Sequence, residues 1–514
     1  MITIILGPPG TGKTEKLLSL VEEYLSKKIH PSRIGYFAFT KKAANEALSR
    51  AMHKFNLSED DLPYFRTLHS LAFRRLSINK NQVMKKFHYQ DLGKKLGFSI
   101  AYASYQDDFG GYFSSDSDYL NLISLARVRG IPVEEQFDLN EHESDIERDK
   151  LIFIANELER YKKEIGLIDF TDMILKFTEK DVAPKLDVMF IDEAQDLSLL
   201  QWKMVKQMWR KCDQVFVAGD DDQAIFRWAG ADVDSFIALE GKTIVLDQSY
   251  RVPSGDIHNL SINLANRISN RRDKIWRPKT SEGILRYHGD IQQVDMSSGE
   301  WLVLARTKYL LEDTKDFCEE RGWYYNFKNE KSVNEDTFKA IVDWEHWRKG
   351  QELNYNDVKN IYGHMSSKKI NQAHKLGKTL LKDQTYIIED CMKDYGLNTN
   401  DVWYESLDEI DFRTKEYIRT MRRNGELLKQ EPRIKLSTIH GMKGGECDNV
   451  VLLSDLTENT MRNFEKTTDD ENRLFYVGAT RNKKQLHIVE PKSFDMSYPL
   501  RQAKIQSQGL PTTH

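Results

Sequence analysis

Residues 2–14 read Ile-Thr-Ile-Ile-Leu-Gly-Pro-Pro-Gly-Thr-Gly-Lys-Thr, and this stretch decides the fold. A β-branched, apolar run leads into a glycine-rich turn that matches the pattern G-x-x-x-x-G-K-[ST]. The residues that follow, from Leu17 to Tyr24, carry apolar side chains at helical spacing. Strand, turn and helix in this order form a phosphate-binding loop, where backbone N–H groups and the helix N-terminus face phosphate oxygens. The stretch therefore predicts an α/β domain with a nucleoside triphosphate site.

Each residue type in the loop has a chemical reason to be there. Lys13 has the length and charge to reach the β and γ phosphates, and the Thr14 hydroxyl suits a Mg²⁺ ion. The backbone of the turn closes around the phosphates. The residues expected to bind the nucleotide here are Gly10, Thr11, Gly12, Lys13 and Thr14, and the expected metal ligands are Thr14 and Asp192.

A second stretch supplies the carboxylates of the site. Residues 188–193 read Val-Met-Phe-Ile-Asp-Glu, an apolar strand that ends in two acidic residues. Asp192 at the strand end suits the coordination shell of Mg²⁺, and Glu193 suits the polarisation of an attacking water molecule. We therefore expect these two residues to complete a hydrolytic site.

Composition limits the class of protein. The chain has 514 residues, 75 Lys and Arg, 79 Asp and Glu, and a formal net charge of −4. At roughly 150 residues per domain this length indicates three to four domains. The four cysteines form no C-x-x-C pair, and no apolar run approaches ~18 residues. We expect a cytoplasmic, intracellular protein without disulfides, whose contacts with nucleic acid depend on local placement of charge.

Strand and helix patterns alternate in three segments, roughly 1–80, 165–333 and 430–492, as in a parallel sheet flanked by helices. Segments 81–164 and 334–429 lack repeated strand runs and are rich in helix-forming and aromatic residues. These two segments are expected to be mainly helical insertions in an α/β framework.

Beyond the first loop, the sequence resembles the UvrD/Rep-like superfamily 1A helicases. The string Ile-Asp-Glu-Ala-Gln-Asp at 191–196 is similar to the D-E-x-Q-D string of that family. Other strings that resemble the family's motifs follow in its order. They are Phe39–Ala44, Thr67–Ser70, Asp169–Asp172, Gly219–Trp228, Gln248–Arg251, Ser437–Glu446 and Leu474–Arg481.

The resemblance implies an α/β fold with two RecA-like P-loop domains, each carrying a mainly helical insertion, and ATP bound between the two domains. The implied division is 1–80 plus 165–244 (motor domain 1A), 81–164 (insertion 1B), 245–333 plus 430–492 (motor domain 2A), 334–429 (a short insertion 2B) and 493–514 (a C-terminal tail). The implied catalytic residues are Lys13, Asp192, Glu193, Gln223, Arg251 and Arg481. Tyr250 is expected to stack on adenine, and Glu446 to accept from a ribose hydroxyl.

On the nucleic-acid side, the family binds a single strand through stacking and backbone contacts. The matching positions are Phe39, Thr40, Thr67, His69, Trp228 and His440. Trp228 also has the alternative of core packing, and the two histidines that of ordinary hydrogen-bonded side chains. Two basic clusters are candidates for phosphate contacts, although charge runs are often only solvated faces. They are Arg267, Arg271, Arg272, Lys274 and Arg277, and Arg413, Lys415, Arg419, Arg422 and Arg423.

The sequence leads to one principal function and keeps alternatives open. The principal hypothesis is an ATP- and Mg²⁺-dependent DNA helicase that translocates on single-stranded DNA, with the family's 3′ to 5′ polarity, and acts at junctions of single- and double-stranded DNA. The alternative is a DNA-stimulated ATPase that remodels complexes or drives a partner nuclease without unwinding. A small-molecule kinase predicts no stimulation by DNA. RNA as the track and a protein partner stay open, while a monomer without membrane contact is expected.

Overall fold

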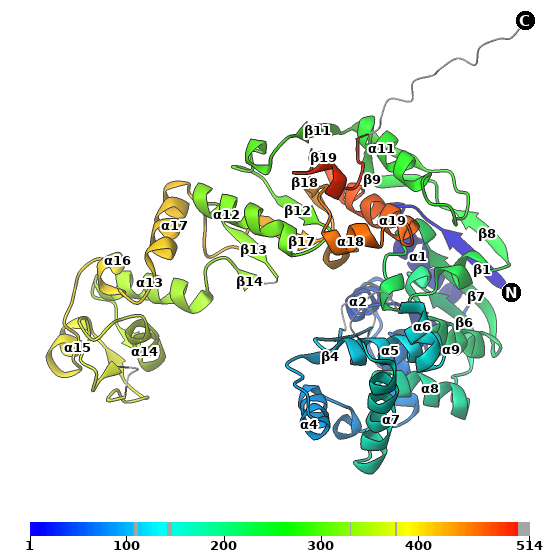
Figure 1. Ribbon diagram of the computed structural model, residues 1–514, viewed down its shortest axis with the longest axis horizontal. Helices are drawn as coiled ribbons and strands as arrows, with labels where there is room; N and C mark the ends of the chain where they lie inside the picture. Colours follow the sequence, from blue (N-terminus) through cyan, green and yellow to red (C-terminus); the bar gives the residue numbers. More distant parts are fainter. Residues whose placement is uncertain (107–111, 141–145, 329, 376–377, 502–514) are drawn as a thin grey trace, which may run out of the picture. The chain divides into compact units, whose positions relative to one another are not determined.

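The computed structural model describes residues 1–106, 112–140, 146–328, 330–375 and 378–501. The chain divides into two compact units, which are described one at a time (Figure 1). Unit 1 comprises residues 1–282 and 464–480, and unit 2 comprises 283–463 and the residues from 481 onward. Of the tail expected at 493–514, residues 502–514 lie outside the described part.

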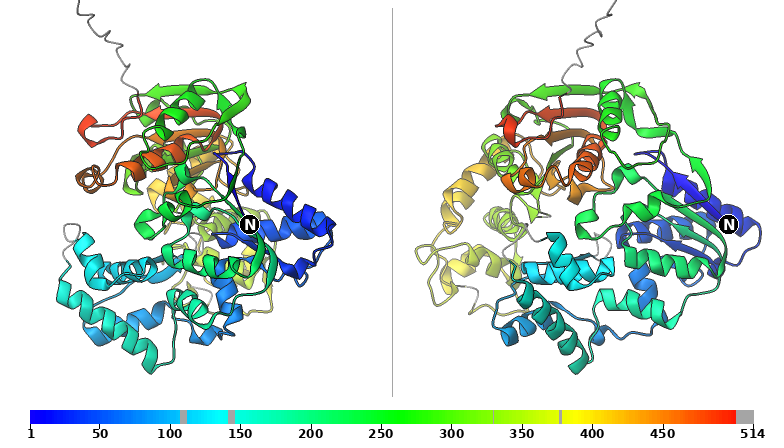
Figure 2. Two further views of the ribbon diagram at one scale, coloured as in Figure 1. Left: turned by 90° about the vertical axis from the view of Figure 1, so that its right-hand side faces the viewer. Right: turned by 45° about the vertical axis from the view of Figure 1, so that its right-hand side comes forward.

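Unit 1 is built on a six-stranded sheet with the order β3-β2-β6-β7-β1-β8. Every pairing in it is parallel. Strand β1 lies between β7 and β8, so the start of the chain pairs with segments far along the sequence, and Figure 2 shows these blue and green strands side by side. The strands are β1 (Ile2–Leu6), β2 (Ile34–Phe37), β3 (Phe65–Arg66), β6 (Leu186–Ile191), β7 (Cys212–Gly219) and β8 (Lys242–Val245).

The central strands are buried on both faces, which explains their continuous apolar runs. Val188 and Phe190 of β6 are 0% exposed, and the Phe190 ring stacks on Phe216 with 5.1 Å between centroids. Parallel strands require crossover connections, and helices supply them. These helices are α1 (Lys13–Ser26), α2 (Lys41–Phe55), α3 (Leu68–Arg75), α8 (Phe170–Lys180) and α9 (Leu199–Trp209).

Residues 81–164 are mainly helical and surround a small core of their own. Their elements are α4 (Lys86–Leu96), β4 (Ala103–Gln106), β5 (Tyr112–Ser115), α5 (Asp118–Arg129), α6 (Val133–Asn140) and α7 (Arg148–Glu164). The antiparallel pair β4–β5 was not predicted from the sequence.

Buried ion pairs join this insertion to the start of α8. Arg127 Nη1 lies 2.5 Å and Lys162 Nζ 3.0 Å from Oδ2 of Asp169, which is 1% exposed. Burial raises the pKa of Asp169, but the two cations outweigh burial and hold it below its usual value. The carboxylate therefore stays ionised, and its Oδ1 accepts from the N–H of Asp172 at the first turn of α8.

The rest of unit 1 packs beside the sheet. Helix α19 packs against α11, where the Asn472 side chain donates to the carbonyl of Arg267 at 2.8 Å. Strands β9 and β10 form a separate parallel pair. The elements are α10 (Val233–Ile237), β9 (Gln248–Ser254), α11 (Asp256–Ala265), β10 (Arg277–Glu282) and α19 (Thr468–Ala479).

Unit 2 contains a seven-stranded sheet with the order β11-β19-β18-β12-β17-β13-β14. All of its pairings are parallel except β13–β14. The elements are β11 (Ile284–His288), β12 (Trp301–Ala305), α12 (Glu312–Arg321), β13 (Tyr325–Phe327), β14 (Glu330–Lys331), β17 (Ile434–Thr438), β18 (Cys447–Leu453), α18 (Glu458–Arg462) and β19 (Asn482–Val489). The predicted α/β class, with parallel sheets flanked by helices, is confirmed.

The described part of residues 334–429 is again mainly helical and contains a short antiparallel pair, β15–β16. Trp344 and Trp347 of α13 are 0% exposed, and the Nε1 of Trp347 donates to the carbonyl of Tyr386 at 2.9 Å. The elements are α13 (Glu335–Trp347), β15 (Leu353–Asn354), α14 (Tyr355–Gly363), β16 (Thr385–Tyr386), α15 (Ile388–Asp394), α16 (Trp403–Ser406) and α17 (Phe412–Arg423).

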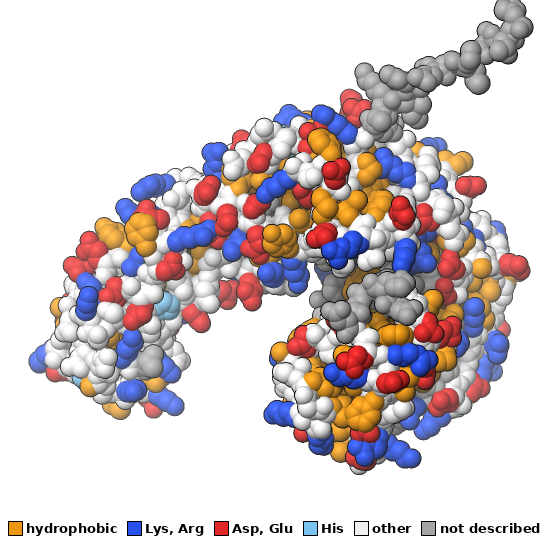
Figure 3. All heavy atoms as spheres, viewed as in Figure 1, with side chains coloured by type: hydrophobic (Ala, Val, Ile, Leu, Met, Phe, Trp, Pro, Cys, Tyr) orange, Lys and Arg blue, Asp and Glu red, His pale blue; other side chains and the backbone are white. Residues whose placement is uncertain are grey.

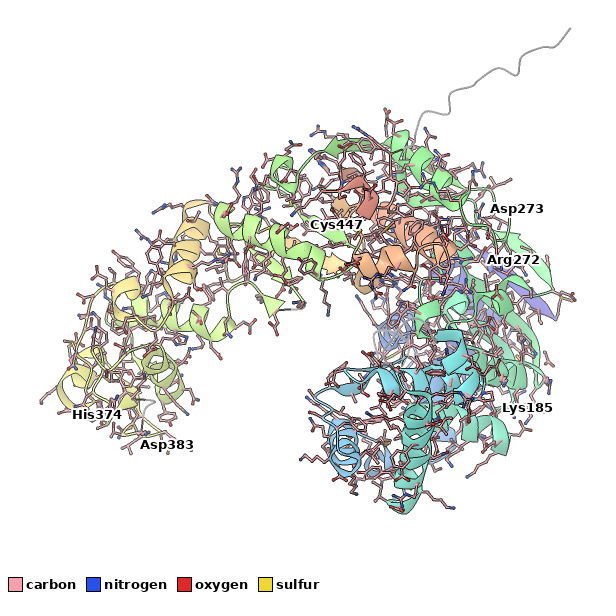
Figure 4. The ribbon with its side chains drawn as sticks, in the orientation of Figure 1. Lys185, Arg272, Asp273, His374, Asp383 and Cys447 are labelled. Atoms are coloured by element: carbon pink, nitrogen blue, oxygen red, sulfur yellow. The ribbon has the colours of Figure 1, made fainter. Side chains whose placement is uncertain are left out.

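The cysteines form no disulfide, as expected. All four are free, and Cys447, which Figure 4 labels, begins β18. Within the described ranges, no helix combines the length and apolar character that crossing a bilayer requires.

The tryptophan pair of α13 gives a stability prediction. We expect Trp347→Ala to cost roughly 3–5 kcal/mol, because it removes a fully buried ring and leaves the Tyr386 carbonyl without its donor. Chemical denaturation of the full chain measures this cost. Tyr309→Ala serves as control, since that side chain is 77% exposed and its loss should stay within about 0.5 kcal/mol. Equal midpoints for the two variants would contradict the core assignment.

Candidate functional site

The glycine-rich turn lies at the carboxyl end of β1 and leads directly into α1. The N–H of Gly7 donates to the carbonyl of Gly219 at 3.1 Å, which joins the turn to the end of the neighbouring strand β7. Lys13 Nζ donates to the Gly7 carbonyl at 2.8 Å, so the ammonium folds back over the turn. The Lys13 ammonium and the N-terminus of α1 therefore lie together at the glycine-rich turn. Both carry positive charge that suits the phosphate chain of a nucleotide.

Gly10 marks a close approach between the turn and β9. Its φ of 74° favours glycine, and a Cβ at this position would collide with the Cβ of Arg251. The N–H of Tyr250 donates to the Gly10 carbonyl at 2.8 Å, and the Ser249 hydroxyl donates to the carbonyl of Pro9 at 2.9 Å. These contacts place Arg251 and the 74%-exposed Tyr250 ring beside the phosphate loop, within unit 1.

Asp192 ends β6 and faces the first turn of α1. Its Oδ2 accepts from the Thr14 hydroxyl at 2.9 Å and from the Tyr36 hydroxyl at 2.8 Å. Burial, aided by neighbouring Glu193, raises the pKa of Asp192. Tyr36 is a partner that the sequence analysis missed, because an apolar strand gives no sign that a tyrosine hydroxyl reaches a carboxylate.

The pair Thr14–Asp192 fits a Mg²⁺ ion bound together with a nucleotide. Mg²⁺ usually takes one or two carboxylates and completes its shell with phosphate oxygens and water. Among the residues that the structure describes, no group of three or more His, Cys, Asp and Glu could hold a metal ion. A hydroxyl and one carboxylate next to a phosphate loop are therefore the donor set expected for a nucleotide-borne ion.

A path of hydrogen bonds connects Glu193 with Gln223. Gln195 Nε2 donates to Glu193 Oε2 at 2.5 Å, and Gln195 Oε1 accepts from the N–H of Asp220 at 3.0 Å. Asp220 Oδ2 then accepts from Gln223 Nε2 at 2.6 Å. A Cβ at Gly219 would lie 2.5 Å from Gln195 Oε1, so glycine is required for this approach. The Gln195 amide thus holds the carboxylate that suits a general base, and the Asp220 carboxylate holds the amide that suits a phosphate sensor. The backbone N–H of Asp220 links the two.

Comparison with known proteins agrees with this geometry. The family described as "UvrD/REP helicase N-terminal domain" matches residues 2–243, and "UvrD-like helicase C-terminal domain" matches residues 410–493. The chain belongs to the UvrD/Rep helicase family.

Individual members of the UvrD/Rep family are similar to this chain at low identity. The ATP-dependent DNA helicase PcrA of Staphylococcus epidermidis is 23% identical, over 85% of this chain and 62% of that protein. The ATP-dependent DNA helicase Rep of Buchnera aphidicola is 21% identical, over 95% of this chain and 92% of that protein. A probable DNA helicase II homolog of Mycoplasma pneumoniae is 24% identical, over 97% of this chain and 83% of that protein. The chain thus spans about 62% of the length of the PcrA relative.

Three of the residues expected from the UvrD/Rep motifs lie in unit 2. Arg481 is 1% exposed, and its Nη1 donates to the Gly445 carbonyl at 3.4 Å. Glu446 forms an ion pair with Lys483 at 3.4 Å, and His440 follows β17 in a short 3₁₀ turn. Arg481 and Glu446 are therefore neighbours, while the roles of all three toward nucleotide or DNA stay predictions.

Four of the residues expected to bind a strand have structural duties in unit 1. The hydroxyls of Thr40 and Thr67 cap α2 and α3 by accepting from Ala43 and Ser70. His69 packs on Phe170, and burial lowers the pKa of its imidazole to about 4. The Phe39 ring is 5% exposed and stacks on Phe226 at 5.7 Å. This position indicates a packing role for Phe39, and direct contact of these four residues with DNA stays a prediction.

Trp228 is exposed at the surface of unit 1. It lies in a short 3₁₀ helix, Arg227–Ala229, and is 58% exposed, although the rings just before it are buried. The alternative of core packing is therefore wrong for Trp228. Phe226, held by Phe39, fixes the base of the segment that presents this side chain.

Three members of the first basic cluster are engaged inside unit 1, which contradicts the sequence hypothesis for these three side chains. The Lys274 side chain is 1% exposed and lies within 3.1 Å of three aspartates, and Arg271 forms two hydrogen bonds with Asp222. Arg272 donates to the carbonyl of Ile237. Sequence alone could not distinguish these side chains from a solvated face, because their acidic partners are far away along the chain.

Two members of the second basic cluster form ion pairs on the surface of unit 2, and a third lies over an aromatic ring. Arg413 lies 2.6 Å from Asp316, and Arg419 lies 2.6 Å from Glu416. The Arg422 guanidinium lies over the Trp403 ring at 5.8 Å. Figure 3 shows acidic and basic side chains interspersed on the visible face of this unit, which is unlike a uniform phosphate-binding patch.

Glu193 gives the sharpest test of the hydrolytic site. We expect Glu193→Gln to keep nucleotide binding and to lose about 10² or more in turnover, because the amide keeps the shape and removes the base. Turnover and nucleotide affinity, measured on the same preparation, separate the two effects. Glu15→Gln is the control, since that side chain is 66% exposed on α1. A loss in turnover below about tenfold would be incompatible with a general base at Glu193.

Proposed function

We propose that this chain is an ATP-dependent DNA helicase that moves on single-stranded DNA and separates duplexes. The observation that carries the proposal is the continuous path from Glu193 through Gln195 and Asp220 to Gln223, in the segment that also presents Trp228. A motor needs such a connection, because each change at the nucleotide must reach the track. The names of the PcrA and Rep relatives support the same activity.

The nucleotide proposed is ATP with Mg²⁺. Lys13 and the N-terminus of α1 bind the phosphates, Thr14 and Asp192 hold the ion, and the exposed Tyr250 ring stacks on adenine. When bound, the ion would supply positive charge beside the phosphates. Glu193 accepts a proton from the attacking water molecule, and Gln223 orients that water or the γ-phosphate. Arg251, Arg481 and Glu446 take the roles expected from the family, with both arginines stabilising charge in the transition state.

The partner proposed is single-stranded DNA and its junctions with duplex, with 3′ to 5′ polarity. Trp228 stacks on a base, and Thr40, Thr67, His69, Phe39 and His440 border the track. RNA as a track, a protein partner, a monomeric state and a cytoplasmic location stay predictions. The proposed domains are those expected from the sequence: motor domain 1A (1–80 plus 165–244), insertion 1B (81–164), motor domain 2A (245–333 plus 430–492) and insertion 2B (334–429).

A strand-displacement assay tests the function. Duplexes with a 3′ tail, a 5′ tail or no tail are incubated with ATP and Mg²⁺, and the released strand is measured. We expect release from the 3′-tailed duplex. Lys13→Ala should release no strand, because its ammonium is the main charge aimed at the phosphates. ATP hydrolysis stimulated by single-stranded DNA without any release would support the alternative of a DNA-stimulated remodeller and overturn the helicase proposal.

Trp228 gives a separate prediction for the track. We expect Trp228→Ala to weaken affinity for single-stranded DNA by roughly 1–3 kcal/mol and to reduce DNA-stimulated turnover, while basal turnover survives. Binding titrations and ATPase rates with and without DNA check this. Phe87→Ala is a matched control, because Phe87 is also 58% exposed in unit 1. A fall in melting temperature with an equal loss of basal turnover would sink the stacking role.

A further inference from the structure

Three consecutive aspartates follow β7 and are withdrawn from water. Asp220, Asp221 and Asp222 are each 0% exposed. Burial of ionised carboxylates costs several kcal/mol each unless cations and hydrogen-bond donors surround them. Cations and N–H donors must therefore balance the three buried carboxylates, and most of them come from the segment that follows α11.

Lys274 is the centre of that compensation. Its Nζ lies 3.1 Å from Asp220 Oδ1, 2.6 Å from Asp221 Oδ1 and 3.0 Å from Asp222 Oδ2. Burial lowers the pKa of Lys274, but the three carboxylates outweigh burial and hold it above its usual value. The ammonium is thus charged and makes ion pairs with all three aspartates, although its side chain is 1% exposed.

Three arginines also surround the three aspartates, but they contact Asp221 and Asp222 rather than the Asp220 carboxylate. Arg271 pairs with Asp222 at 2.6 Å, and the N–H of Arg272, which Figure 4 labels, donates to Asp221 Oδ2 at 2.6 Å. Arg473 of α19 donates from Nε to the Asp221 carbonyl at 3.0 Å. The Asp220 carboxylate differs from its neighbours. Among the described residues, the cation within ion-pair distance of it is Lys274.

Asp220 is also the carboxylate that holds the sensor. Its Oδ2 accepts from Gln223 Nε2 at 2.6 Å, while Lys274 engages Oδ1. Its N–H donates to Gln195, which in turn donates to Glu193. Rotation of this carboxylate would therefore release the Gln223 amide, whereas Gln195 is held by the backbone N–H of the same residue.

We propose that Lys274 is a positioning residue for ATP hydrolysis, holding the Asp220 carboxylate so that the Gln223 amide keeps its place. The inference rests on the proposed function and adds to it a residue outside the motif strings of the sequence. Lys274 acts through Asp220 and has no direct contact with nucleotide. Its loss therefore lowers turnover much more than nucleotide affinity.

The test compares Lys274→Met with Lys274→Arg in the full chain. We expect Lys274→Met to lower kcat by roughly 10²-fold with less than about a threefold change in nucleotide Kd, because misplacement by about 1 Å is enough for such a loss. Lys274→Arg should restore at least part of kcat. Lys211→Met is the matched control, since Lys211 pairs with Asp181 at 2.8 Å on the surface. Unchanged kcat in Lys274→Met would overturn the inference.

A double variant separates positioning from stability. Asp221→Asn combined with Lys274→Met removes one negative and one positive charge, and the Asn carbonyl can still accept from the N–H of Arg272. We expect the melting temperature to recover toward wild type while kcat stays low, because Asp220 still lacks its cation. Recovery of both would show that Lys274 only balances charge, and would overturn the inference even if the single variant fails to fold.

The same measurements distinguish a failure of the Lys274 inference from a failure of the proposed function. Wild-type protein without ATP turnover would overturn the proposed function itself. Wild-type turnover together with full activity of the double variant would overturn only the role assigned to Lys274.

Discussion

The parallel order of β6, β7 and β1 is the constraint on which the site depends. Parallel neighbours bring their carboxyl ends to one edge of the sheet, so Asp192, Gly219 and the phosphate loop meet there although they are far apart in sequence. The bond from Gly7 to the Gly219 carbonyl and the bond from Thr14 to Asp192 both follow from this adjacency.

That convergence concentrates acidic groups in a buried place, and the fold has to balance them. Asp192 is satisfied by hydroxyl donors, from Tyr36 and Thr14, and burial raises its pKa. Asp220 and its two acidic neighbours are satisfied by cations instead. The difference fits the roles proposed for these groups. A carboxylate proposed to meet Mg²⁺ needs partners that can give way to the ion, whereas buried aspartates without such a ligand need cations that balance their charge.

Sequence reasoning reached the parts of this site that depend on local order. The turn before Lys13 and the strand before Asp192 are visible because period, turn residues and charge lie within a few positions of each other. The contact of Tyr36 with Asp192 and the burial of Lys274 were not predictable, because both depend on which strands become neighbours. Lys274 appeared as one of several surface cations for that reason. Phe39 likewise matched a strand-binding motif, while its 5% exposure follows from the rings of Tyr112 and Phe226 that pack on it.

The loop that contains Gln223 is connected to two other parts of the molecule. One is Trp228, in the same segment. The other is α19, because Arg473 donates to the Asp221 carbonyl and Arg227 pairs with Asp470 at 3.4 Å. Helix α19 belongs to unit 1, and β19, which follows it, belongs to unit 2, so the chain passes between the units just before Arg481. A movement of α19 would therefore reach Arg481 through covalent bonds. A shift at Gln223 would thus reach both Trp228, which is proposed to stack on a base, and an arginine of the other unit without a long chain of noncovalent contacts.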